Sequence, residues 1–147
     1  TGFYNRNAYD YFIYNEKNIK NYMVVTFDLN NLKMCNDNYG HSSGDAYIIH
    51  SAHIIETTFD RFGKCYRIGG DEFCCLIPDA AEFQIERFIQ KMQQDIAILN
   101  NKNIIPTEVG IACGYALATP DDADIEKVRE RADEMMYHNK KVLKGLI

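Results

Sequence analysis

The residues with the clearest capacity for chemistry lie in the stretch YRIGGDEFCCLI, residues 66–77, where two carboxylates follow two glycines. Apolar runs on both sides of Gly69 and Gly70 predict a tight β-hairpin whose turn needs positive φ. A glycine pair alone is ordinary turn chemistry. With Asp71 and Glu72 at the tip, a phosphate or a metal ion can approach bare backbone beside two acids. The hairpin therefore predicts a site for a phosphorylated ligand or a cation.

A second candidate acid, Asp28, comes near the end of the apolar, β-branched run 22–29, which is typical of a central strand covered on both faces. An aspartate in this position can also simply begin a turn or cap the next helix. The segment 30–37 predicts a short helix directly after the strand, and the free N–H groups at its start form a phosphate cradle. Strand end and helix start together favour a binding site.

The elements that must position these residues follow from apolar periodicity and turn residues. The element order predicts an α+β fold with a βαββαβ-type, palm-like core, in which helices pack on a mostly antiparallel sheet. On the last helix, Met135 and Met136 are predicted to face the core. The predicted elements are a first helix capped by Asn5, the strand 22–29, the short helix 30–37, a longer helix after the turn 39–45, hairpin strands 64–68 and 73–77, a helix over 79–101, a strand over 108–118 and a helix over 124–143.

In this topology the first strand pairs antiparallel with the strand that leaves the hairpin, so Asp28 and Asp71 meet. Two carboxylates held close together repel each other unless a cation neutralises them. Mg²⁺ favours one or two carboxylates together with the phosphate oxygens of a nucleotide. The sequence therefore predicts one or two Mg²⁺ ions, or Mn²⁺ in their place, between these two acids.

The composition limits the function classes. A chain of 147 residues with 46% apolar residues fits one domain, 1–147, with a substantial core. A net charge of −5 argues against a protein that binds nucleic-acid backbones, because such binding needs a clustered excess of Lys and Arg. The five cysteines are odd in number and include no C-x-x-C pair, which indicates reduced, buried thiols instead of disulfides or a zinc site.

The sequence also bears on location. No apolar run approaches the roughly 18 residues that span a bilayer, and no signal-peptide pattern is present. We therefore expect a cytoplasmic domain without direct membrane contact, which also fits the cytoplasmic part of a membrane-anchored protein. Because the sequence starts at Thr1 without a methionine, we expect a fragment of a longer protein whose missing N-terminal part supplies a sensor or a dimerisation region.

Two motifs, in order and suitably spaced, resemble those of the GGDEF family, the diguanylate cyclases, whose core is nucleotidyl-cyclase-like. Residues 69–73 read GGDEF, and residues 28–45 resemble the family pattern DxDxFKxxNDxxGHxxGD. Asn30 and Leu32 depart from this pattern by replacing its second aspartate and its phenylalanine. The matching positions are Asp28, Lys33, Asn36, Asp37, Gly40, His41, Gly44 and Asp45.

The two ends of the chain extend the resemblance over nearly its full length. The opening TGFYNR, residues 1–6, is similar to the family's TGLxNR. Residues 132–140, ADEMMYHNK, are similar to ADxALYxAK, which the family continues as xxGRN. Here Leu143, Lys144 and Gly145 stand in place of Gly, Arg and Asn. A lysine cannot make the bidentate fork of the expected arginine.

The resemblance implies a reaction in which two GTP molecules give cyclic di-GMP and two pyrophosphates. It implies that Asp28, Asp71 and the carbonyl of Leu29 hold the metal, and that Asp71 accepts the proton of the attacking ribose 3′-hydroxyl. Lys33 would stabilise the charge that builds on the phosphate in the transition state. Because one domain holds one GTP, the reaction needs a second GGDEF domain, and we expect the isolated chain to be mostly monomeric and slow.

The same resemblance implies how GTP is bound. Lys140 and Lys144, one helical turn apart, would hold the terminal phosphates. A carboxylate such as Asp45 accepts from the N1–H and N2–H donors of guanine but meets a lone pair on adenine, which selects GTP. The other predicted substrate contacts are Asn36 and, by analogy, His41 for the base, with Gly70 and Glu72 at the hairpin.

Two other functions stay open. The departures from the family pattern favour a catalytically weak or inactive GGDEF-like module that binds GTP as a signal. A nucleotidyl transferase on a similar palm-like core, acting on ATP or a nucleic-acid primer, is disfavoured by the acidic charge and by Asp45. Competition of ATP against GTP in a binding assay separates this last reading from the others.

Product inhibition gives a further prediction. Many family members are inhibited by product at an Arg-x-x-Asp just before the hairpin. In this chain the corresponding residues 60–63 read DRFG, with Asp60 where the motif has its arginine and Gly63 where it has its aspartate. We therefore predict no feedback inhibition by this route.

Overall fold

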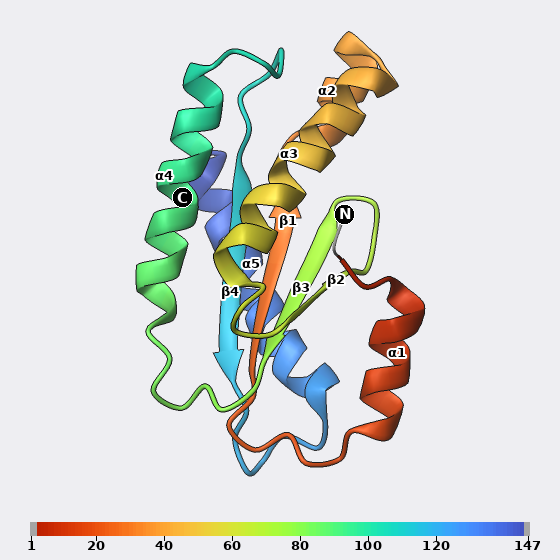
Figure 1. Cartoon of the computed structure of the whole chain (residues 1–147), viewed down its shortest axis with the longest axis vertical. Coiled ribbons are helices and arrows are strands. Elements are labelled where there is room, and N and C mark those ends of the chain that lie inside the picture. Colours follow the sequence, from red (N-terminus) through yellow and green to blue (C-terminus); the bar gives the residue numbers. More distant parts are fainter. Residues whose placement is uncertain (1–2, 146–147) are drawn as a thin grey trace.

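The computed structural model describes residues 3–145, and its strands form one sheet with the order β2-β3-β1-β4 (Figure 1). β1 pairs antiparallel with β3 and β4, and β2 pairs antiparallel with β3. This arrangement confirms the predicted α+β fold, although Thr1 and Gly2 of the TGFYNR opening lie outside the described residues. In chain order the elements are α1 (Arg6–Asn15), β1 (Met23–Leu29), α2 (Leu32–Tyr39), α3 (His41–Phe59), β2 (Lys64–Arg67), β3 (Glu72–Ile77), α4 (Ile85–Asn101), β4 (Ile111–Leu117) and α5 (Ile125–Leu143).

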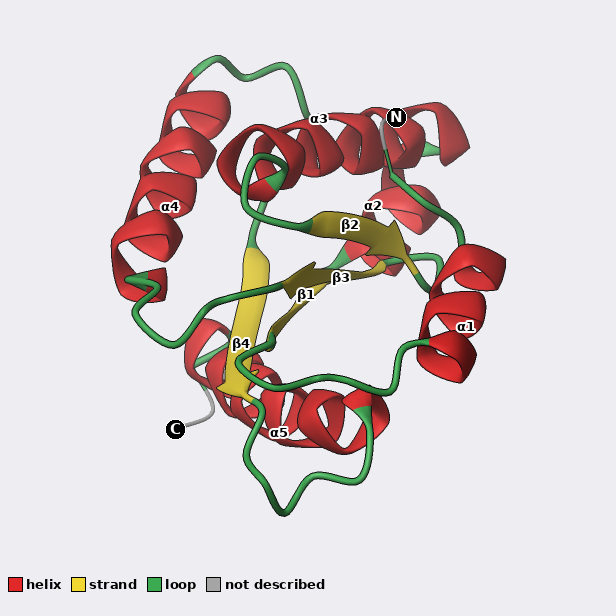
Figure 2. Cartoon of the chain, turned by 60° about the horizontal axis from the view of Figure 1, so that its bottom comes forward, coloured by secondary structure: helices red, strands yellow, loops and turns green. Residues whose placement is uncertain are grey.

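β1 is central, and every one of its residues is buried. Its side chains alternate between two cores because successive strand residues point to opposite faces of the sheet. Val25 and Phe27 pack in the core beneath α3 and α4, whereas Val24 packs in the core on the side of α5 and α1. Figure 2 shows the sheet between these two layers. By the same alternation Asp28 lies on the α5 face, which determines the helix that can reach it.

Side chains cap two helices at their starts. Asn5 accepts a hydrogen bond from the Ala8 N–H at 2.9 Å, so the predicted cap of α1 is confirmed. At α5, Asp124 accepts from the Lys127 N–H at 3.1 Å. Each cap satisfies one of the N–H groups that a helix start leaves free.

Two other predicted boundaries are wrong. α4 begins at Ile85 instead of Asp79, because Asp79 has a φ of +50°, which no α-helix accommodates. β4 begins at Ile111, later than predicted, because a side chain takes the backbone groups just before it. The Asn100 amide donates to the Val109 carbonyl at 3.0 Å and accepts from the Val109 N–H at 2.8 Å.

Both outer edges of the sheet are covered. At β2, the Tyr4 N–H donates to the Cys65 carbonyl at 2.9 Å, and the Tyr4 carbonyl accepts from the Arg67 N–H at 2.8 Å. At β4, three side chains spaced four residues apart on α5 bond to strand groups spaced two apart. The pairs are Asn139 with the Cys113 N–H at 3.0 Å, the Met135 sulfur with the Tyr115 N–H at 3.5 Å, and Arg131 with the Leu117 carbonyl at 2.9 Å. The prediction that Met135 faces the core is therefore wrong, and this side chain is 40% exposed.

Candidate active site

The predicted hairpin is present, but its turn differs from the prediction. Neither Gly69 nor Gly70 has a positive φ, because the loop is longer than a two-residue turn and the Gly69 N–H donates to the Glu72 carbonyl at 3.3 Å. The Arg67 guanidinium holds the loop by donating to the carbonyls of both glycines, at 3.2 and 2.7 Å. A Cβ added at Gly70 would meet nothing within 4 Å. Open space therefore lies beside the backbone that leads into Asp71.

The register of β1 and β3 brings the predicted metal ligands together. Asp28 pairs with Glu72 across the two strands, and the Leu29 N–H donates to the Asp71 carbonyl at 3.0 Å. The N–H and C=O of an extended residue point to the same side of the strand, so the Leu29 carbonyl also faces Asp71. Asp71 therefore converges, from a distant part of the sequence, with Asp28 and the carbonyl of the adjacent Leu29 at the end of the sheet.

Asp28 is almost fully buried, with 5% of its surface exposed. Its Oδ2 accepts a hydrogen bond from Lys140 Nζ at 2.8 Å, whereas its buried Oδ1 has no hydrogen-bond partner among the described residues. Burial raises the pKa of Asp28, the hydrogen bond from Lys140 opposes this rise, and the nearby Asp71 carboxylate adds to it. A buried carboxylate oxygen without a partner is costly, so this position fits a ligand of a cation.

The two predicted phosphate-binding lysines lie in different environments. Burial alone would lower the pKa of Lys140, but its hydrogen bond with Asp28 and the charge of that acid raise the pKa overall. Lys144 is the C-cap of α5 and is exposed. One lysine therefore neutralises the buried acid, and the other lies on the open side of the site.

Two further carboxylates crowd the same region. Burial raises the pKa of Glu72, and the charges of Asp28, Asp71 and Asp133 raise it further. Burial also raises the pKa of Asp133, which α5 supplies. Within the described part of the chain, no group of three or more His, Cys, Asp or Glu side chains is arranged to hold a metal ion. The donor set instead fits Mg²⁺, which takes few carboxylates and completes its shell with water and phosphate oxygens.

A cleft of about 430 Å³ opens beside these residues, between the end of β1, α2, the hairpin and the end of α5. Asn31 has a φ of +61° and turns the chain from β1 into α2. The start of a helix leaves N–H groups free to bind an anion, as the sequence predicts for this segment. Of the predicted site residues, Leu29, Lys33, Asp71, Lys140 and Lys144 line the cleft.

The predicted base-binding residues gather at the turn between α2 and α3. Asn36 packs so closely on Gly44 that a Cβ added to the glycine would lie 1.6 Å from the Asn36 Oδ1. His41 begins α3, Asp45 follows Gly44 directly, and both side chains are exposed. Gly40 joins the two helices with a φ of +89°, a conformation that glycine adopts without steric cost. Asn36, His41 and Asp45 therefore lie near one another, beyond the residues that line the cleft.

Residues 1–144 match the family model described as diguanylate cyclase, GGDEF domain. The chain belongs to the GGDEF family. This GGDEF domain is 31% identical over 119 residues to diguanylate cyclase DgcN of Escherichia coli. The aligned region covers 80% of this chain and 29% of that protein. It is 28% identical over 120 residues to diguanylate cyclase DgcP of the same organism, covering 81% of this chain and 35% of that protein. The chain thus spans about a third of the length of these relatives.

Solved structures share the fold. The GGDEF domain of DgcB from Caulobacter crescentus, in complex with c-di-GMP, has a TM-score of 0.81 at 23% identity, covering 96% of this chain and 87% of that chain. The active GGEEF domain of a diguanylate cyclase from Vibrio cholerae has a TM-score of 0.75 at 19% identity, covering 94% and 90% of the respective chains. Within the described residues of this GGDEF domain, no helix is long and apolar enough to cross a membrane.

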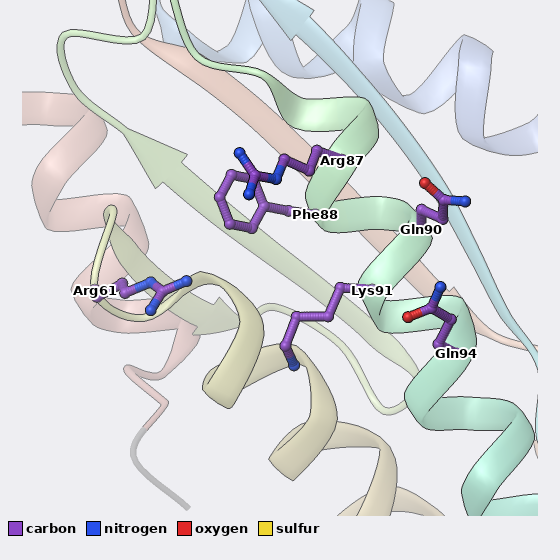
Figure 3. Close-up of a pocket in the computed structure, with 6 residues that line it drawn as sticks. All are labelled: Arg61, Arg87, Phe88, Gln90, Lys91 and Gln94. Carbon is purple, nitrogen blue, oxygen red and sulfur yellow. The ribbon is translucent and has the colours of Figure 1, made fainter.

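A second, basic pocket of about 450 Å³ lies where α3 ends beside α4. Figure 3 shows Arg61, from the loop after α3, and Lys91, from α4, on opposite sides of it. The Arg61 guanidinium lies over the rings of Phe62 and Phe88, at 4.8 and 5.8 Å from their centres, and Lys91 pairs with Asp95 at 2.7 Å. This pocket contains the stretch 60–63 in part, and the absence of product binding there stays a prediction.

Three supporting side chains of this GGDEF domain escaped the sequence analysis. Arg67 holds the hairpin loop, Asn100 holds the start of β4, and the Tyr47 hydroxyl bonds to the Asn30 carbonyl at the end of β1. Each acts on backbone carbonyl or N–H groups that no sequence pattern reveals. For Tyr47 a weak signal exists, because helical spacing puts it on the same face of α3 as the apolar Ile54 and Ile55.

Proposed function

We propose that this GGDEF domain is a diguanylate cyclase that condenses two GTP molecules into cyclic di-GMP and releases two pyrophosphates. The observation that carries the proposal is the convergence of Asp28 and Asp71 beside a cleft that lysines line. Both acids lie at signature positions of the family, and the relatives DgcN and DgcP are named diguanylate cyclases.

Asp28, Asp71 and the Leu29 carbonyl would hold Mg²⁺ or Mn²⁺. Such an ion, when bound, polarises the substrate phosphates and offsets the negative charge of the reaction. The unpartnered Oδ1 of Asp28, judged among the described residues, and the mutual repulsion of the acids support this ligand set. Glu72, next to Asp71, has a secondary role at the edge of the site.

The protein's own groups account for proton transfer and phosphate binding. Asp71 follows Gly70, beside which the backbone is open, and would accept the proton of the ribose 3′-hydroxyl. Lys33 would stabilise charge on the reacting phosphate. Lys140 would hold Asp28 before substrate arrives and add its charge to the phosphate site, and the exposed Lys144 would bind the terminal phosphates.

Guanine would bind at the turn between α2 and α3. The Asp45 carboxylate would accept hydrogen bonds from guanine N1–H and N2–H, and Asn36, which packs on Gly44, and His41 would add contacts. Adenine would present a lone pair to Asp45 and be rejected. GTP is therefore the proposed substrate, and the cytoplasm is the proposed location of the domain.

Catalysis would need a second copy of the domain, because the product joins two nucleotides and each domain holds one. The two copies would face each other so that the hydroxyl of one nucleotide reaches the phosphate of the other. The specific rate should then rise with protein concentration. A rate that stays flat over a hundredfold dilution series would contradict the two-domain requirement.

A GTP-binding signalling module without turnover is the second candidate. The residues at four family positions favour it, since they differ from the family pattern. They are Asn30, Leu32, Leu143 and Lys144. GTP binding without pyrophosphate release, even from two domains joined artificially, would support this alternative.

The decisive experiment uses such a forced dimer with GTP and Mg²⁺, with the product identified by chromatography. We expect cyclic di-GMP from the unaltered dimer and none above background from the Asp71→Ala dimer. A dimer that binds GTP but yields no cyclic dinucleotide would overturn the cyclase proposal.

A further inference from the structure

A buried hydroxyl lies where β1 and the edge strand β4 separate. Tyr47, on α3, is fully buried, and its hydroxyl lies 2.6 Å from the Asn30 carbonyl oxygen and 3.0 Å from the Gly110 nitrogen. A hydroxyl carries one proton, so it donates to the nearer Asn30 carbonyl and accepts from the Gly110 N–H. Burial raises the pKa of Tyr47 to about 12, so the hydroxyl keeps its proton at neutral pH.

This hydroxyl supplies the second link between Asn30 and Gly110, whose backbones share only one direct hydrogen bond. β1 and β4 pair up to Leu29 and Ile111, and one step further the Asn30 N–H donates to the Gly110 carbonyl at 2.8 Å. The return path, from the Gly110 N–H to the Asn30 carbonyl, runs through the Tyr47 hydroxyl. One side chain on α3 therefore fixes the peptide that follows Asn30.

That peptide connects the metal side of the site to its phosphate side. Asn30 follows Leu29, whose carbonyl faces Asp71, and precedes Asn31, whose φ of +61° starts α2. A shift of the Asn30 carbonyl would rotate the neighbouring peptide that contains the Leu29 carbonyl, and it would displace the helix that carries Lys33.

We propose that Tyr47 is a positioning residue for metal and nucleotide binding: its hydroxyl sets the direction of the backbone from Leu29 to Asn31. The inference rests on the proposed function and deepens it. A purely apolar role for this ring would be served equally well by phenylalanine. Phenylalanine would leave the buried Asn30 carbonyl and the part-buried Gly110 N–H without this partner, and unpaired polar groups away from water are costly.

The test compares Tyr47→Phe with Tyr9→Phe. Tyr9 is a matched control because it is also fully buried and its hydroxyl also makes a hydrogen bond, to Glu126 at 2.7 Å, on the α1 side of the sheet. The readout is Mn²⁺ affinity in the presence of a non-hydrolysable GTP analogue, followed by the paramagnetic signal of the ion, so turnover is not required. We expect Tyr47→Phe to weaken Mn²⁺ binding about tenfold, the effect of one buried hydrogen bond, and Tyr9→Phe to leave it unchanged.

The inference would be overturned if Tyr47→Phe bound Mn²⁺ as tightly as the unaltered protein. It would also be overturned if both variants lost Mn²⁺ affinity to the same extent. If Tyr47→Phe does not fold, Gly110→Ala takes its place, because the added Cβ would lie 3.1 Å from the Asn30 Nδ2 and press on the same turn. No change in Mn²⁺ affinity in that variant would also overturn the inference. Absence of nucleotide and Mn²⁺ binding in the unaltered protein would overturn the proposed function, and this inference with it.

Discussion

The cleft beside Asp28 and the basic pocket are of similar size, about 430 and 450 Å³. They differ in whether their polar side chains already have partners. In the cleft, residues from four parts of the chain meet beside a buried carboxylate oxygen that has no partner among the described residues. In the basic pocket the charges come from exposed side chains, and two of them already have partners: Arg61 lies on two rings, and Lys91 pairs with Asp95. A buried polar group without a hydrogen-bond partner is therefore a better indication of where a phosphate and a metal would bind than positive charge alone.

The contrast between the cleft and the basic pocket fails if catalysis does not need Asp71. Asp71→Ala in a forced dimer should lower cyclic di-GMP formation about 10²- to 10⁴-fold, because it removes both a proposed metal ligand and the proposed base. Pyrophosphate release measures the rate. Asp121→Asn, at an exposed acid before α5, serves as the control and should keep full activity. An Asp71 variant as active as this control would remove the cleft from the mechanism.

The nucleotide base offers the next test. Asp45→Asn should weaken the preference for GTP over ATP roughly tenfold, because a neutral amide loses the charge-assisted hydrogen bonds to guanine. Competition of ATP against a fluorescent GTP analogue measures the preference. If the preference is the same in Asp45→Asn and in the unaltered protein, guanine binds elsewhere.

A smaller effect is expected at the open side of the cleft. Lys144→Arg restores the residue of the family pattern and should lower the KM for GTP roughly threefold, because a guanidinium can make two parallel hydrogen bonds to a phosphate. Lys141→Arg is the matched control, since Lys141 is also exposed near the end of α5 but does not line the cleft. A rise in KM at Lys144→Arg would speak against a phosphate contact there.

The crowding of acids predicts a pH effect on stability. The pKa of Glu72 is raised in the folded protein by burial and by Asp28, Asp71 and Asp133, so the folded state holds this proton more tightly than the unfolded chain does. The contribution of protonated Glu72 to the free energy of unfolding is therefore present below the ordinary glutamate pKa of 4.5. It is lost as the pH rises through the raised pKa of the folded state.

Glu72→Gln removes this penalty without changing the shape of the side chain. Its thermal midpoint should exceed that of the unaltered protein by a few degrees near neutral pH, and the difference should shrink toward pH 4.5. Mg²⁺ should also shrink the difference, since the ion relieves the same repulsion. A difference that is constant with pH would mean that the four acids do not interact as described.

The smallest expected effect concerns the basic pocket. Arg61→Ala should leave the binding of cyclic di-GMP unchanged, because Asp60 and Gly63 occupy the positions of the arginine and the aspartate in the family's inhibitory motif. Calorimetric titration with cyclic di-GMP measures this, with Gln90→Ala as a neighbouring control. Tight binding that disappears in Arg61→Ala would prove the prediction wrong and give the basic pocket a function of its own.

The fold was largely predictable because its signals are local. The fully buried β1 reads as a continuous apolar run, and the caps Asn5 and Asp124 follow from helix-start preferences. The boundaries that failed depend on tertiary contacts: Asn100 withdraws the backbone of Val109 from β4 through a bond across the loop. Positive φ at Asp79 likewise has no clear signal in an aspartate.

The meeting of Asp28 and Asp71 was predictable, and the side-chain contacts around them were less so. The motif positions predicted that Asp28 and Asp71 meet, because antiparallel pairing fixes which residues oppose each other. That Lys140 would bond to Asp28, and that Arg67 would hold the glycine loop, depends on the reach of long side chains. Such choices are decided by three-dimensional distance, which spacing along the chain does not encode.

The covered edges of the sheet bear on how two copies can assemble. Tyr4 occupies the outer side of β2, and the column of Arg131, Met135 and Asn139 occupies the outer side of β4. Part of each outer strand is therefore already bonded, which disfavours a continuous sheet from one copy to the next. If two copies meet during catalysis as proposed, they would do so through helix faces and loop tips, and such a contact would let them separate to release the product.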